Sequence, residues 1–189
     1  LQSEVGASLF AGGYMKDSFL DKIKSLADDV AARESCIVYD VEFAGGGGSR
    51  VLRVYIDKDV EAGVSIDDCS NVSRGLNLIL DVEDVIPGGK YFLEVSSPGL
   101  ERVLKKDWHF TKVIGKTILV KSFAPMLDFN SALPQLGKAK QIKGELLSQN
   151  PDGIKMTVEL AGKPEEVYVP FSEIAKANVV FEYGKAQQN

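Results

Sequence analysis

The pattern of apolar residues differs between the two sides of the segment Ser96-Ser97-Pro98-Gly99. Before this segment, stretches with an apolar residue at every third or fourth position alternate with stretches of period two, which predicts helices and strands in turn. After it, the pattern consists mostly of short strands separated by turns. The chain has 189 residues, a length typical of one large domain or two small ones. We therefore predict an α+β protein of two domains, residues 15–98 and 114–189, joined by a junction over residues 99–113.

Two helices are expected in the first domain. Residues 16–34 carry apolar side chains at spacings of three and four, which gives a helix one apolar face. A second helix is expected to begin after Ser65, whose hydroxyl can cap it. The negative charges of Asp67 and Asp68 would stabilise its first turn, where the helix dipole is positive. Residues 1–14 lack such periodicity, and we interpret them as a vector remnant or a disordered leader.

Three strands accompany these helices. Residues 37–43 and 50–56 alternate apolar and polar side chains, which is typical of strands with one buried face. The glycine run at 45–48 separates them and is expected to form the tip of a hairpin, because glycine is costly in regular structure. Residues 91–95 predict the third strand. The order αββαβ indicates a two-layer sandwich with both helices on one face of the sheet.

The second domain is expected to be a small barrel. Its junction is partly helical over residues 100–112, and a longer loop occupies residues 123–137. Asn150-Pro151-Asp152-Gly153 predicts a hairpin turn, because proline fixes φ and glycine accepts a positive φ. Five short strands within about 75 residues imply a sheet that closes into a barrel, because closure removes exposed sheet edges. The expected strands cover residues 117–122, 141–148, 154–160, 167–170 and 177–183.

The net charge also differs between the two halves of the chain. Residues 15–102 contain 10 Lys and Arg against 17 Asp and Glu, a net of −7. Residues 103–189 contain 12 Lys against 9 Asp and Glu, a net of +3. Such asymmetry between halves indicates two modules with different surfaces.

The sequence offers little for catalysis, a metal or a cofactor. The only histidine, His109, would have to carry any His-dependent nucleophile alone, and we interpret it as a surface or packing residue. Two cysteines and one histidine fall short of the four ligands of a zinc cage. No apolar run approaches the roughly 20 residues that span a bilayer. We expect a soluble protein of the reducing cytoplasm, without catalytic residues, metal or cofactor, and with no membrane partner.

Lysines gather around the junction and the first strand of the second domain. They could neutralise the phosphates of RNA, or they could be ordinary solvated lysines. The acidic first domain would instead attract a strongly basic protein, with Asp67, Asp68 and Asp81 as candidate contacts. The lysines are Lys105, Lys106, Lys112, Lys116 and Lys121, followed by Lys138, Lys140 and Lys143.

The run Leu93-Glu94-Val95-Ser96-Ser97-Pro98-Gly99-Leu100-Glu101-Arg102 resembles the bacterial ribosome maturation factor family RimP. The segment 68–81 is similar to the second helix of that family, and the order of elements agrees over residues 15–183. Val103 departs from the proline usual in the family. The resemblance implies a non-enzymatic assembly factor for the small (30S) ribosomal subunit, with an α/β N-terminal domain and an SH3-like C-terminal barrel. It also implies a basic small-subunit ribosomal protein and nearby rRNA as partners. We expect the protein to be a monomer.

The contact residues are expected at and after the family-like segment. Ser-Ser-Pro-Gly can equally be a simple strand terminator, whereas conspicuous loop residues often carry function. A guanidinium such as that of Arg102 can pair with a carboxylate or a phosphate through two hydrogen bonds. General RNA binding without ribosome specificity, or an acid–base hydrolase built on His109, remain alternatives. The expected contacts are Ser96, Ser97, Pro98, Gly99, Leu100, Arg102, Lys105, Lys106 and Lys116.

Overall fold

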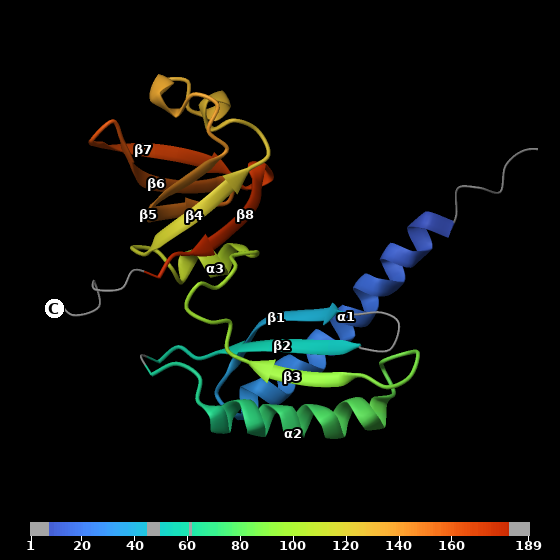
Figure 1. Cartoon of the computed structure of the whole chain (residues 1–189). Helices are drawn as coiled ribbons and strands as arrows, with labels where there is room; N and C mark the ends of the chain where they lie inside the picture. Colours follow the sequence, from blue (N-terminus) through green and yellow to red (C-terminus); the bar gives the residue numbers. More distant parts are fainter. Residues whose placement is uncertain (1–7, 45–49, 61, 182–189) are drawn as a thin grey trace, which may run out of the picture. The chain divides into compact units, whose positions relative to one another are not determined.

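The computed structural model describes residues 8–44, 50–60 and 62–181 of the chain. Its contacts divide the chain into two compact units, residues 1–98 and residues 99–189 (Figure 1). The first unit combines helices with a three-stranded sheet, and the second is built mainly of strands. The predicted α+β class is therefore confirmed. Among the described residues, no helix has the length and apolar character required to cross a membrane.

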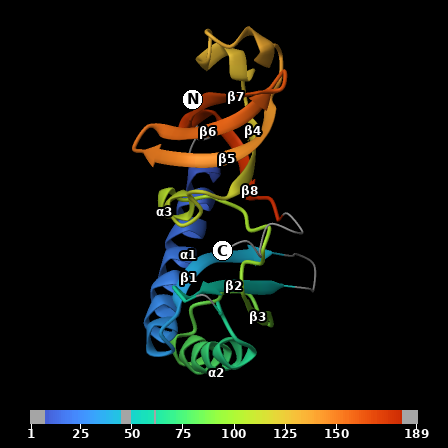
Figure 2. The ribbon, with the colours of Figure 1, turned by 90° about the vertical axis from the view of Figure 1, so that its left-hand side faces the viewer.

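The first unit has its two helices on one face of the sheet (Figure 2). The sheet order is β1-β2-β3, with β1 antiparallel to β2 and β3 parallel to β2. One core cluster holds side chains of both helices together with Leu52, Val54 and Ile56, the inward face that the alternation on β2 predicted. The elements are α1 (Ser8–Arg33), β1 (Ile37–Ala44), β2 (Val51–Asp57), α2 (Ile66–Glu83) and β3 (Phe92–Ser96).

The first helix is longer than the sequence suggested. It begins at Ser8, so residues 8–14 are helical, while residues 1–7 lie outside the described part of the chain. Extending an existing helix adds one hydrogen bond for each residue that is fixed, whereas starting a new helix is costly. A weakly patterned segment can therefore continue a helix that it would not have nucleated.

The strand β1 departs from simple alternation. Its pairing with β2 shifts between Val38 and Asp40, which leaves Tyr39 as the extra residue of a bulge. Val38 and Tyr39 are consecutive and both are buried, and beyond the bulge Val41 and Phe43 pack against the core. An inserted residue changes the phase of the pleat, which the period-two pattern could not reveal. The expected glycine tip at residues 45–48 lies outside the described residues.

The second unit forms a single antiparallel sheet in the order β7-β6-β5-β4-β8. Three residues link β7, at one end of this order, to β8 at the other. A flat sheet of five strands would be about 19 Å wide, at roughly 4.8 Å per strand, which is beyond the reach of so short a link. The sheet must therefore curl. The elements are α3 (Asp107–Thr111), β4 (Thr117–Ser122), η1 (Met126–Phe129), η2 (Pro134–Leu136), β5 (Gln141–Asn150), β6 (Gly153–Leu160), β7 (Lys163–Pro170), η3 (Phe171–Glu173) and β8 (Ile174–Val179).

The hairpin turn after Asn150 is confirmed, but the role expected for Gly153 is wrong. The side-chain oxygen of Asn150 accepts hydrogen bonds from the backbone N–H groups of Asp152 and Gly153. Gly153 is not among the glycines with a positive φ. A Cβ at this position would instead lie 2.4 Å from the carbonyl oxygen of Val169, so glycine is needed for close approach of β7.

The two helices of the first unit meet at Gly75, and this contact can be tested. A Cβ added at Gly75 would lie 2.7 Å from Cγ1 of the buried Val30. Gly75→Ala should lower the free energy of unfolding by about 1–2 kcal/mol, because overpacking outweighs the gain of about 1 kcal/mol in helix propensity. Urea denaturation followed by circular dichroism measures this change. In a Val30→Ala background the loss should disappear, and an equal loss in both backgrounds would contradict the contact.

Candidate interaction surfaces

The family-like segment starts at the end of β3 and continues as an exposed turn. Ser96 and Ser97 are exposed, and Pro98 is half-buried. Gly99 has a φ of 79°, a left-handed conformation that favours glycine. Leu100 is 63% exposed and belongs to neither core cluster. An exposed leucine in an ordered turn is available to a partner.

Arg102 closes this turn. Its Nε donates a hydrogen bond to the carbonyl oxygen of Gly99 at 3.1 Å. Its own carbonyl accepts a hydrogen bond from the backbone N–H of Val179, at the end of β8. The guanidinium is thus partly committed to shaping the turn.

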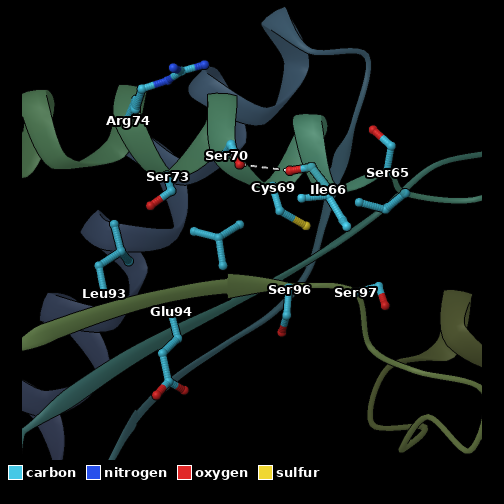
Figure 3. Close-up of a pocket in the computed structure, with 12 residues that line it drawn as sticks. Ser65, Ile66, Cys69, Ser70, Ser73, Arg74, Leu93, Glu94, Ser96 and Ser97 are labelled. Atoms are coloured by element: carbon cyan, nitrogen blue, oxygen red, sulfur yellow. Dashed lines mark hydrogen bonds between the residues drawn. The ribbon is translucent and has the colours of Figure 1, made fainter.

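An open groove lies between α2 and β3 in the first unit (Figure 3). Its volume is about 870 Å³, and its strand side is residues 93–97. In the close-up, Cys69 and Ile66 point from α2 toward the strand, whereas Arg74 points away from it. Glu94 and Ser96 project on the side of β3 away from α2. Successive residues of a strand point to opposite faces of the sheet, and consecutive residues of β3 line the groove. The groove therefore runs along the edge of β3 and not only along one face.

The start of α2 is fixed by a capping box. The Ser65 hydroxyl accepts from the Asp68 N–H at 3.1 Å, and the Asp68 carboxylate accepts from the Ser65 N–H at 2.9 Å. Lys58 Nζ lies 2.6 Å from the other carboxylate oxygen of Asp68. The hydrogen bond from Lys58, followed by those from Ser65, lowers the pKa of Asp68 from 3.8 to about 2. Asp68 thus fixes the start of α2, which forms one wall of the groove. Because its carboxylate is already bonded to Lys58 and Ser65, it is less available to a partner.

His109 is a packing residue, one of the two possibilities expected for it. It is completely buried beside Trp108, and its Nδ1 accepts a hydrogen bond from the backbone N–H of Lys105 at 3.1 Å. This contact orders the segment that carries Lys105 and Lys106 immediately before α3. The histidine therefore supports the lysine-bearing loop.

The expected lysines do not form one cluster. Lys105 lines a hollow in the second unit together with Lys176 of β8. Lys176 is directly opposite Lys121 of β4, on the outer face of the sheet. Lys116 precedes β4 at its other end, and it is exposed there. The structure thus joins Lys105 and Lys121 through Lys176 and leaves Lys116 apart.

Three exposed residues were missed by sequence analysis. Lys176 stands alone in the sequence, and only strand pairing brings it to Lys121. Ile66 and Phe92 lie in the expected second helix and third strand, and they are 85% and 68% exposed at α2 and β3. The pattern of apolar residues could not reveal their exposure, because an apolar residue on the surface cannot be distinguished from a core residue by sequence alone.

Comparison with known families identifies the first unit. The family model of the RimP N-terminal domain matches residues 26–101. The first unit is a RimP N-terminal domain. The match supports membership in the RimP family of ribosome maturation factors, so the predicted resemblance is confirmed. It includes α2, β3 and the turn up to Glu101, and it ends before Arg102.

The Lys58–Asp68 contact predicts a pH dependence of stability. A carboxyl whose folded pKa is lowered stabilises the fold above its ordinary pKa of 3.8, and this contribution is lost as the pH falls toward about 2. Asp68→Asn should therefore be less stable than the parent protein at neutral pH, and the difference should shrink between pH 4 and pH 2. Denaturation of both proteins across this range measures it. Asp67→Asn, which removes the same charge from the same turn, should show a smaller change, and equal behaviour would contradict the assignment.

The pair of opposite lysines predicts a substitution that increases stability. Like charges directly opposite on neighbouring strands repel, so Lys121→Thr should raise the free energy of unfolding by about 0.2–0.5 kcal/mol at low salt. The gain should fall as salt screens the repulsion. Thermal unfolding at several salt concentrations measures both effects. Lys155→Thr is the matched control, because Lys155 faces Ser148 and Tyr168.

Proposed function

We propose that this protein is an assembly factor that binds the immature small (30S) ribosomal subunit and promotes its maturation. The observation that carries the proposal is the RimP N-terminal domain match over residues 26–101. It includes the Ser96–Leu100 part of the expected contact segment. We further propose that the factor acts in the cytoplasm, as a monomer and without catalysing a reaction.

The partners are proposed from the charges of the two units. The first unit carries the excess of acids, and in it Asp67, Asp81 and Asp84 are exposed. It is suited to a basic small-subunit ribosomal protein. The second unit presents Lys105, Lys176 and Lys121, which are suited to the phosphates of nearby rRNA.

The second unit is proposed to be an SH3-like barrel. Its five antiparallel strands and the three-residue link from β7 to β8 support a curled, small-barrel architecture. The domain limits are proposed as residues 15–98 and 114–189, with a junction over residues 99–113. The turn around the exposed Leu100 then belongs to the junction in the sequence.

The proposed mechanism is stabilisation by mass action. A factor that binds a folded region of the subunit, but not its unfolded form, stabilises the folded form by RT ln(1 + [L]/Kd) and so raises its population. No covalent chemistry is needed for this effect. The burial of His109 and its hydrogen bond from Lys105 support such a role over one in acid–base catalysis.

Co-sedimentation with purified immature and mature small subunits tests the proposal. The protein should bind immature subunits at physiological salt, and Arg102→Ala/Lys105→Ala/Lys106→Ala should weaken binding by about tenfold or more. The matched control is Lys138→Ala/Lys155→Ala/Lys163→Ala, which removes the same charge from other parts of the second unit and should bind nearly as the parent. Circular dichroism confirms that both variants are folded. Absence of binding to either subunit form would refute the proposal.

General RNA binding is the second candidate, and the Lys121–Lys176 pair is the observation that favours it. Two exposed lysines opposite each other on a sheet face can bind any phosphate backbone. In that case unrelated RNA would bind as tightly as the subunit, with a steep loss of affinity as salt increases. Lys121→Thr would then weaken both interactions equally.

A further inference from the structure

The outer edge of β3 is open. In the sheet order β1-β2-β3, this strand has β2 on one side and, among the described residues, no strand on the other. Its parallel pairing with β2 includes the hydrogen bond from Phe92 N–H to the carbonyl oxygen of Arg50. Alternate residues of a parallel strand bond to the same neighbour, so Phe92, Glu94 and Ser96 face β2. Leu93 and Val95, and Ser97 beyond them, direct their N–H and C=O groups outward.

These outward groups line an accessible groove. Within the described part of the chain, no helix or loop forms a hydrogen bond with the backbone of Leu93, Val95 or Ser97. The groove between α2 and β3 runs beside all three residues (Figure 3). A second hollow is lined by the later part of α2 with Tyr91 and Phe92. The two hollows together follow β3 along its length.

The groove has the features of a site for an added strand. A peptide that joins a sheet edge gains main-chain hydrogen bonds, and its alternate side chains enter flanking pockets. Ile66 and Phe92 are both largely exposed beside the groove and provide apolar surface for such side chains. Proteins commonly protect open edges with charged residues or proline, but Leu93, Val95 and Ser97 are none of these.

The charge around the groove selects the occupant. The helix α2 carries four acids and its C-cap Asp84 a fifth, against the single cation Arg74, but Asp68 is paired with Lys58 and Glu83 with Lys22. The charged residues that line the first groove are Arg74 and Glu94, the latter paired with Arg53, so the excess of acid lies at the second hollow. Asp81 and Asp84 line the second hollow, where Lys90 is the one cation. Arg74 hydrogen-bonds to Asn71 and points away from β3. A second copy of this chain would bring a second acidic α2 to the edge, whereas a basic segment would be attracted to it.

We propose that the outer edge of β3 binds an extended, basic segment of a partner protein, which adds to the sheet as a fourth strand. This inference deepens the proposed function, on which it rests, by assigning a binding mode to the basic protein partner. The partner's main chain pairs with Leu93, Val95 and Ser97. Its apolar side chains contact Ile66 and Phe92, and its cations face Asp81 and Asp84.

Amide hydrogen exchange with a model peptide tests the proposal. The probe is a short capped peptide in which Lys and Val alternate, added to the full chain and observed by NMR. At saturation, exchange at the amides of Leu93, Val95 and Ser97 should slow by about tenfold or more, because they become hydrogen bonded. The amides of Phe92, Glu94 and Ser96 are already bonded and should change little. A peptide in which Glu and Val alternate should give no protection.

Two variants make the test specific. Val95→Pro removes an outward N–H and blocks strand addition, and proline is tolerated on the outer side of an edge strand. It should weaken peptide binding by about tenfold or more while circular dichroism shows the fold retained. Should this variant fail to fold, Asp81→Asn/Asp84→Asn replaces it, with an expected loss of about threefold to tenfold. Asp29→Asn on α1 removes an exposed acid elsewhere and should leave binding unchanged.

The outcomes separate this inference from the proposed function. Unchanged exchange at the three outward amides, or full peptide binding by the folded Val95→Pro, would overturn the edge site. Protection that rises with protein concentration in the absence of peptide would overturn it as well, because the occupant would then be a second copy. If the parent protein binds immature subunits but not the peptide, only the edge site fails. If the peptide binds and the subunits do not, only the proposed function fails.

Discussion

The engagement of Asp68 by Lys58 and Ser65 fixes where α2 begins, and the groove beside β3 depends on that position. Lys58 directly follows β2, and Ser65 directly precedes α2, so one carboxylate ties both ends of the intervening loop. With its start held, α2 turns Val72, Leu76 and Leu80 into the core. The side of its first turn that carries Ile66 and Cys69 then lines the groove along β3. A different helix start would rotate this apolar stripe by about 100° per residue and would move the wall of the groove.

Local rules predicted the elements well, because each rule concerns neighbours in sequence. The capping box at Ser65, the buried alternation on β2 and the bounds of β4 all depend on residues within one turn or one strand. The same is true of the family-like segment, whose position at the end of β3 followed from its residues. Expectations failed where distant residues decide the structure. Gly153 is needed because β7 passes close to it, and the bulge at Tyr39 exists only in relation to β2.

The candidate site was predicted only in part for the same reason. Ser96, Ser97 and Lys105 line hollows that the structure shows, but their neighbours there, Ile66 and Lys176, come from elements far away in sequence. A charge count cannot show that Lys121 and Lys176 are opposite each other, because register is set by the pairing of β4 with β8. Nor can a pattern of apolar residues show which edge of a sheet is open. Both features arise from topology.

Each of the two proposed binding surfaces is weak by itself, which suits the proposed role, because an assembly factor must leave the subunit that it matures. A net gain of about 0.5–1.5 kcal/mol per hydrogen bond limits what the short edge of β3 can contribute. Phosphate contacts by a few lysines are likewise sensitive to salt. Because both surfaces belong to one chain, binding of the first raises the effective concentration of the second. Under the proposed function, the pair would therefore hold an immature subunit, in which both proposed partners are accessible, and release it when maturation covers either one.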